Sequence, residues 1–126
     1  MKKLTTLLIS LMFTLILCFP AFGANTTVPG QKCITITGLD ADWDSTANGY
    51  PQALDIWAVV FYPGATDDSM VINDGGADED AFYESGVCAD KYDARVLYFP
   101  PGTKVKPYID TDDIDVTGAK VKIYFR

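Results

Sequence analysis

The sequence predicts an all-β protein, a small antiparallel β-sandwich with Greek-key, immunoglobulin-like connections and about six to seven strands. Three observations lead to this prediction. Apolar and polar residues alternate over short segments, which is typical of half-buried strands. Glycine, proline and aspartate separate these segments, and no segment keeps apolar residues at helical spacing over three turns. The chain of 126 residues is long enough for one domain with a buried core.

The first 23 residues have the order of a secretory signal peptide. Two lysines precede an apolar run over 4–19, and the small residues Ala21 and Gly23 suit cleavage after Gly23. We therefore expect a periplasmic or secreted protein with no membrane anchor after cleavage. A retained anchor is disfavoured because the run is short and ends in proline. A lipoprotein site at Cys18 is disfavoured because Leu17 precedes it.

The remaining chain is expected to form a flexible N-terminal arm, 24–31, and a single β-sandwich domain, 32–126. The first strand is expected at 32–38. The second, at 53–62, is apolar on both faces, so we expect it to be central and covered on both sides. Its two predicted faces are Leu54, Ile56, Ala58 and Val60 on one side and Trp57, Val59 and Phe61 on the other.

Four later segments also have strand character. A short strand is expected at 69–73, and residues 94–99 form another that ends at a Pro-Pro-Gly turn. Residues 103–109 contain proline and lysine, which favour an edge strand. The last strand, 119–126, should turn its apolar residues Val121, Ile123 and Phe125 inward and its basic residues Lys120, Lys122 and Arg126 toward water.

Two cysteines remain after cleavage, Cys33 and Cys88. In an exported chain, an even pair predicts one disulfide. The alternative, a redox centre, is disfavoured because the pair has no Cys-x-x-Cys spacing. A disulfide limits the separation of the two Cα atoms to about 7 Å. We therefore expect an extra strand near 81–84 that returns the chain toward Cys33.

The chain is acidic, with 17 Asp and Glu against 10 Lys and Arg. This charge repels nucleic acid and anionic membranes, so neither is expected as a partner. The acids gather between the predicted strands, where they either keep the protein soluble or bind Ca²⁺, which takes six to eight oxygen ligands. The carboxylates that we expect to share one end of the sandwich are Asp40, Asp42, Asp44, Asp74, Asp78 and Asp80.

The segment from Asp40 to Ser45 resembles the opening of an EF-hand loop. It departs from that pattern because Ser45 replaces the turn glycine and Pro51 replaces the bidentate glutamate. No helices flank it. The EF-hand interpretation is therefore rejected, and only the general argument from clustered oxygen ligands remains.

The chain contains no histidine, which removes histidine-based triads, the common zinc sites and the usual base at neutral pH. We expect no enzymatic activity. The aromatic residues Trp57, Phe61 and Phe99 lie on predicted strands and are most simply core. Trp43 and Tyr50 lie beside the acidic loops, where they either bind a ligand or fold back to cap the end of the sandwich.

These patterns predict an exported, non-enzymatic binding module, stabilised by a disulfide. Its acidic loops would bind Ca²⁺ or a ligand directly and would present Trp43 and Tyr50 to a protein or a carbohydrate. The alternative is a structural subunit of a surface fibre or adhesin, in which neighbouring subunits exchange a strand. A third possibility is a secreted inhibitor with an exposed loop at 63–69.

Overall fold

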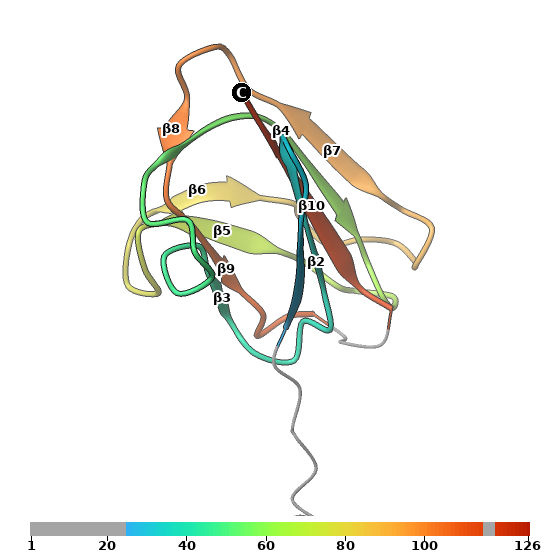
Figure 1. Ribbon diagram of the computed structural model, residues 1–126. Coiled ribbons are helices and arrows are strands. Elements are labelled where there is room, and N and C mark those ends of the chain that lie inside the picture. Colours follow the sequence, from blue (N-terminus) through green and yellow to red (C-terminus); the bar gives the residue numbers. More distant parts are fainter. Residues whose placement is uncertain (1–24, 115–117) are drawn as a thin grey trace, which may run out of the picture.

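The structure is a computed structural model that describes residues 25–114 and 118–126. The predicted signal peptide, 1–23, lies outside the described residues. The described part is all-β, with two antiparallel sheets of six and four strands that face each other as a small sandwich (Figure 1). The expected fold class is confirmed, and residues 25–114 and 118–126 form ten strands in place of six to seven, several of them short. No helix in the described part is long and apolar enough to cross a membrane.

The six-stranded sheet has the order β1-β2-β10-β4-β7, and the short β8 pairs with the start of β4. The strand bounds are Thr26–Pro29 (β1), Cys33–Thr37 (β2), Lys120–Phe125 (β10), Leu54–Tyr62 (β4), Arg95–Tyr98 (β7) and Lys104–Val105 (β8). Within the segment 24–31, which we predicted to be a flexible arm, β1 pairs with β2 along its length. The Gly30 N–H donates to the Cys33 carbonyl at 2.7 Å, which closes a tight hairpin between the two strands.

The four-stranded sheet has the order β3-β9-β5-β6. Its strand bounds are Trp43–Asp44 (β3), Pro107–Asp110 (β9), Val71–Asp74 (β5) and Ala81–Glu84 (β6). The predicted edge strand at 103–109 is therefore two strands. Its first part is β8 in one sheet, and its second part, β9, is central in the other sheet. The chain changes sheet at Lys106, which explains how one alternating segment serves both.

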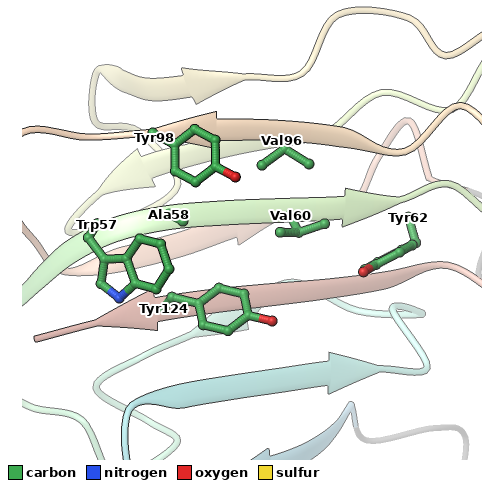
Figure 2. A pocket seen from close by; sticks show the side chains of 7 residues that line it. All are labelled: Trp57, Ala58, Val60, Tyr62, Val96, Tyr98 and Tyr124. Atoms are coloured by element: carbon green, nitrogen blue, oxygen red, sulfur yellow. The ribbon is translucent and has the colours of Figure 1, made fainter.

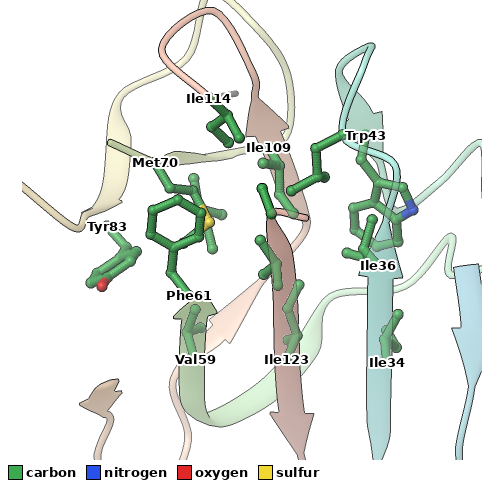
Figure 3. Packing of buried hydrophobic residues seen from close by; sticks show 14 of the residues in the cluster. Ile34, Ile36, Trp43, Val59, Phe61, Met70, Tyr83, Ile109, Ile114 and Ile123 are labelled. Carbon is green, nitrogen blue, oxygen red and sulfur yellow. The ribbon is translucent and has the colours of Figure 1, made fainter. Parts of the chain in front are cut away.

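The hydrophobic core lies between the two sheets (Figure 3). Strict alternation in β2 and β10 buries Ile34, Ile36, Val121 and Ile123 completely, as the sequence predicts. The opposite sheet contributes Ile72 and other apolar residues that close the core. The side chains at Cys33, Thr35, Thr37, Lys120, Lys122 and Tyr124 consequently point to the outer face of the six-stranded sheet.

A β-bulge interrupts β4. Tyr124 is paired with Ala58 and Phe125 with Ile56, so Trp57 is an extra residue without a partner on β10. A bulge of this kind turns two successive side chains, here Trp57 and Ala58, to the same face of the sheet. Trp57 therefore lies exposed on the outer face, and Ile56 before it is buried on the inner face. The predicted faces of this strand are wrong from Trp57 toward the N-terminus, and its outer face is open rather than covered.

The predicted Cys33–Cys88 disulfide is absent, because both cysteines are free. The alternation that buries Ile34 places Cys33 on the outer face of the six-stranded sheet. Cys88 is fully buried in the core cluster, where its N–H donates to the Asp68 carbonyl at 2.9 Å. The two thiols therefore lie on opposite sides of the six-stranded sheet, a placement that does not favour the short separation that a disulfide requires.

Candidate functional site

Within the described part of the chain, the acidic residues are not gathered into a metal centre. Among residues 25–114 and 118–126 there is no group of three or more Asp, Glu, Cys or His side chains that could hold a metal ion. Asp40, Asp78 and Asp80 are exposed. Asp44 accepts a hydrogen bond from the Thr46 N–H at 2.7 Å, and Asp74 accepts one from the Lys106 N–H at 2.9 Å. These two carboxylates cap backbone groups at turns and strand ends.

The register of the four-stranded sheet explains why the predicted cluster does not assemble. Trp43 pairs with Ile109 on β9, so the residues before β3 lie at one end of this sheet. Asp74 pairs with Pro107, so the loop after β5 leaves the sheet at the other end. The two-residue β3 has no signal in the sequence pattern, and it splits the acidic segment between the first two predicted strands, 39–52, between the two ends of the sheet. Asp40 and Asp42 are thereby separated from Asp78 and Asp80.

Asp42 has a structural role instead. Its carboxylate accepts hydrogen bonds from the Tyr108 hydroxyl at 2.7 Å and from the Thr111 N–H and hydroxyl, both at 3.0 Å. Burial alone would raise the pKa of Asp42, but the hydrogen bonds from Tyr108 and Thr111 outweigh it and lower the pKa below its ordinary value. The same hydrogen bond raises the pKa of Tyr108 to about 12. The contact ties the loop before β3 to the end of β9.

The two aromatic residues that we expected to bind a ligand are part of the packing. Trp43 is completely buried, and its indole N–H donates to the Thr27 hydroxyl at 2.9 Å. Tyr50 is partly buried against the core and meets the Phe125 ring edge-on, with the ring centroids 6.4 Å apart. Both residues cap the sandwich, so neither is presented to a ligand.

A different group of aromatic residues lies on the outer face of the six-stranded sheet (Figure 2). Trp57 stacks on Tyr98, with ring centroids 6.3 Å apart and planes 16° from parallel. Its other neighbour is Tyr124, at a centroid distance of 5.3 Å. Tyr98 is 70% exposed and Trp57 is 37% exposed. We call these three residues the aromatic face.

The strand register places the aromatic face around a shallow hollow. Ala58 on β4 pairs with Tyr98 on one side and with Tyr124 on the other. Because Ala58 has only a methyl group, the rings that surround it stand above a low floor. The bulge adds Trp57 to the same face. The hollow has a volume of about 320 Å³ and is lined by Trp57, Ala58, Val60, Tyr62, Val96, Tyr98 and Tyr124.

Positive charge lies beside the aromatic face, although the chain as a whole is acidic. Lys120 and Lys122 share the outer face of β10 with Tyr124. The Lys120 ammonium lies 4.5 Å from the centroid of the Tyr62 ring, a cation–π contact. Toward the end of the sheet, Asp55 is neutralised by an ion pair with the last residue of the chain, at 2.9 Å. The outer face therefore carries a local positive balance.

Comparison of the chain with protein-family models, with curated proteins and with solved structures found no match. The interpretation of the aromatic face consequently depends on its own geometry and chemistry.

Proposed function

We propose that the protein is an exported, non-enzymatic binding module that recognises a carbohydrate through the aromatic face. The observation that carries the proposal is the group of the exposed Trp57 and Tyr98 and the half-buried Tyr124 around the hollow over Ala58. Large aromatic side chains are usually withdrawn from water, so a cluster held on a rigid sheet marks a binding surface. The expectation of export comes from the signal-peptide pattern at the N-terminus.

The geometry of the rings suits a sugar. The Trp57 and Tyr98 rings are nearly parallel, with their planes 16° apart, and both belong to the aromatic face. The face of an aromatic ring is electron-rich, and one face of a pyranose presents C–H groups that carry partial positive charge. Stacking of this kind covers the apolar side of the sugar. The Trp57 N–H and the tyrosine hydroxyls are then available for the sugar hydroxyls at its edge.

The charges narrow the class of carbohydrate. Lys122 lies next to Tyr124 on the same face of β10, and the nearby Asp55 is already paired with Arg126. An acidic sugar, such as a uronic acid, would place its carboxylate where Lys122 can neutralise it. The acidic loops lie on the other sheet and its connections, so their charge does not line the hollow.

The proposal gives Ca²⁺ no part in recognition. The six aspartates that we expected to bind it are divided between the two ends of the four-stranded sheet, and Asp42, Asp44 and Asp74 are engaged with hydrogen-bond donors. These bonds account for their positions in the sequence without a bound cation.

Tryptophan fluorescence tests the proposal. Trp57 is partly exposed and Trp43 is completely buried, so a ligand on the aromatic face changes the emission of Trp57 alone. We expect an oligouronate to bind, with an affinity that falls as salt is added. A neutral oligosaccharide of the same length should bind more weakly. If neither sugar binds at about 10 mM, a concentration at which even millimolar affinity is detected, the proposal is wrong.

Two tyrosines provide a matched pair of variants. Tyr98→Ala removes a ring of the aromatic face, and we expect the affinity to fall about tenfold, equivalent to about 1.4 kcal/mol. Tyr92→Ala removes a more exposed ring, at 81% against 70% for Tyr98, from the loop before β7. It should leave the affinity unchanged. An equal loss in both variants would mean that binding does not occur at the aromatic face.

Two lysines test the charge in the same way. Lys122→Ala should weaken binding of the oligouronate and reduce its salt dependence, while binding of the neutral sugar stays the same. Lys104→Ala changes an exposed lysine on β8, which pairs with the start of β4 and is not on the strand that carries Tyr124. It should leave both sugars unaffected. A salt dependence that survives in Lys122→Ala would place the acidic group of the sugar elsewhere.

A further inference from the structure

The sandwich has four sheet edges, and β7 is the one without protection among the described residues. β3 has only two residues, β1 ends in Pro29, and β6 carries the exposed Glu84. Short strands, proline and charge all discourage the pairing of an edge with another chain. β7 instead exposes Val96 (48%), Leu97 (40%) and Tyr98 (70%) in succession, at the outer margin of the six-stranded sheet (Figure 1).

The hydrogen bonds show which backbone groups of β7 are directed outward. The Phe99 N–H donates to the Trp57 carbonyl at 2.9 Å. In an antiparallel pair, residues that bond to the neighbour recur at every second position. Leu97 therefore also bonds toward β4. Val96 and Tyr98 direct their N–H and C=O groups away from β4, to the open edge.

We propose that two copies of the chain pair along β7, antiparallel, about a two-fold axis at Leu97. In this register Val96 lies opposite the partner's Tyr98, and Tyr98 lies opposite the partner's Val96. Both outward-facing residues of each copy then exchange N–H···O bonds across the axis. Registers displaced by one step use Ala94, whose N–H already donates to Tyr92, or Pro100, which has no N–H.

The side chains are self-complementary in this register. On the outer face, Tyr98 covers the partner's Val96. On the other face, Leu97 meets the partner's Leu97 directly at the axis, where the pair buries surface that is exposed in the single copy. Charge does not oppose the contact, because Arg95 is paired with Asp93 at 2.6 Å and residues 96–98 are uncharged. A second copy therefore fits this edge better than a charged partner would.

The dimer would join two six-stranded sheets into one continuous sheet. Because Tyr98 belongs to the aromatic face, the two aromatic faces would lie side by side on it. The contact uses the same residues on both copies, so it closes at two and does not propagate into a fibre. The dimer contact depends on β7 alone and does not require that the aromatic face bind a carbohydrate.

Light scattering after size-exclusion chromatography tests the dimer. A single short strand gives a small interface, so we expect a dissociation constant of about 10–100 µM and a mass near twice that of the chain above that concentration. A wild-type protein that remains monomeric at about 1 mM, tenfold above this range, overturns the proposal. Masses that rise beyond two copies overturn it as well, because they require an open contact.

Opposite charges at Leu97 test the two-fold axis. Leu97→Lys and Leu97→Glu each place like charges directly opposite one another, so each variant alone should be monomeric. A mixture of the two should form the dimer again, since lysine then faces glutamate. Leu97 lies outside the core cluster, so both variants should fold, and recovery in the mixture would itself require folded protein.

The opposite edge of the same sheet supplies the control. Val28 on β1 is 55% exposed, and Val28→Lys adds the same charge there. This variant should dimerise like the wild type. Loss of the dimer in Val28→Lys, or a mixture of the Leu97 variants that stays monomeric, would place the contact away from β7 and overturn the proposal.

Discussion

Deleting Trp57 from β4 should remove the bulge while keeping the fold. In the folded protein Phe125 is paired with Ile56 and Tyr124 with Ala58, so Trp57 is the extra residue between two regular stretches. Its deletion would make Ile56 and Ala58 consecutive, and they already alternate between the inner and outer faces. No side chain would have to change face, and the aromatic face would lose only the indole.

The cost of this deletion can be worked out from the contacts of Trp57. The deletion removes the hydrogen bond from the Phe99 N–H to the Trp57 carbonyl, about 1 kcal/mol. It also removes the packing of a partly exposed ring against Tyr98 and Tyr124, about another 1 kcal/mol. For a domain of this size the sum lowers Tm by about 10 °C. Trp57→Ala keeps the backbone bond and should cost about half as much.

Deletion of Lys122 is the matched control, because Lys122 also faces outward but lies opposite Val60 in a regular part of the sheet. Its loss would turn either Val121 or Ile123 out of the core. Exposing one of these fully buried residues costs about 2–5 kcal/mol. Burying an outward-facing residue in its place adds a further cost. Such a loss is a large part of the stability of a small domain, about 5–15 kcal/mol.

Thermal unfolding followed by circular dichroism measures all three variants. We expect Trp57→Ala to be the most stable, the deletion of Trp57 to be close below it, and the deletion of Lys122 to be far below both or unfolded. If the deletion of Trp57 destabilises the protein as much as the deletion of Lys122, β4 has no bulge at Trp57. Trp57 would then not share the outer face of β4 with Ala58.

Three further predictions concern the residues that proved structural. Asp42 has a lowered pKa in the folded state, so its stabilising contribution is present above its ordinary value of 3.8 and is lost as the pH falls through the folded-state pKa. Tyr108 has a raised pKa, so its contribution is complete below pH 10 and is lost as the pH rises to about 12. Tyr108→Phe should reduce the pH dependence of Tm in both ranges, and an unchanged profile would contradict the hydrogen bond. Millimolar CaCl₂ and excess EDTA should give the same Tm, whereas a bound ion at one hundred times its Kd would add about 2.7 kcal/mol. A reducing agent should leave Tm unchanged, and a thiol reagent should label Cys33 in the native protein but Cys88 only after unfolding.

The inward-facing residues were predictable for the strands that have one solvent-exposed face. In β2 and β10 the solvent side carries threonine and lysine, so the period of two identifies Ile34, Ile36, Val121 and Ile123 as core. The same period places Cys33 outside, which already argues against a disulfide to a buried partner. The prediction of the disulfide failed because it relied on the number of cysteines rather than on the face that each would occupy.

β4 was not predictable in the same way, because residues 56–62 are all apolar or aromatic and alternation cannot reveal a bulge. The available signal lay on the neighbouring strand, where Lys120, Lys122 and Tyr124 mark a face open to water. A face of the sheet that is exposed to solvent on β10 is also exposed to solvent on the strand paired with it. Applied to β4, this reasoning moves the exposed aromatic residues away from the loops and onto the sheet.

The distribution of charge connects the aromatic face to the acidic composition. The carboxylates of Asp42, Asp44 and Asp74 lie on or beside strands of the four-stranded sheet, and the lysines beside Tyr124 belong to the other sheet. A polyanion is therefore repelled by most of the surface and attracted at one face. Long-range repulsion of this kind disfavours random adsorption, while Lys120 and Lys122 act within about 10 Å at ordinary salt. For the proposed acidic carbohydrate, the negative net charge would then add to the specificity for the aromatic face instead of opposing binding there.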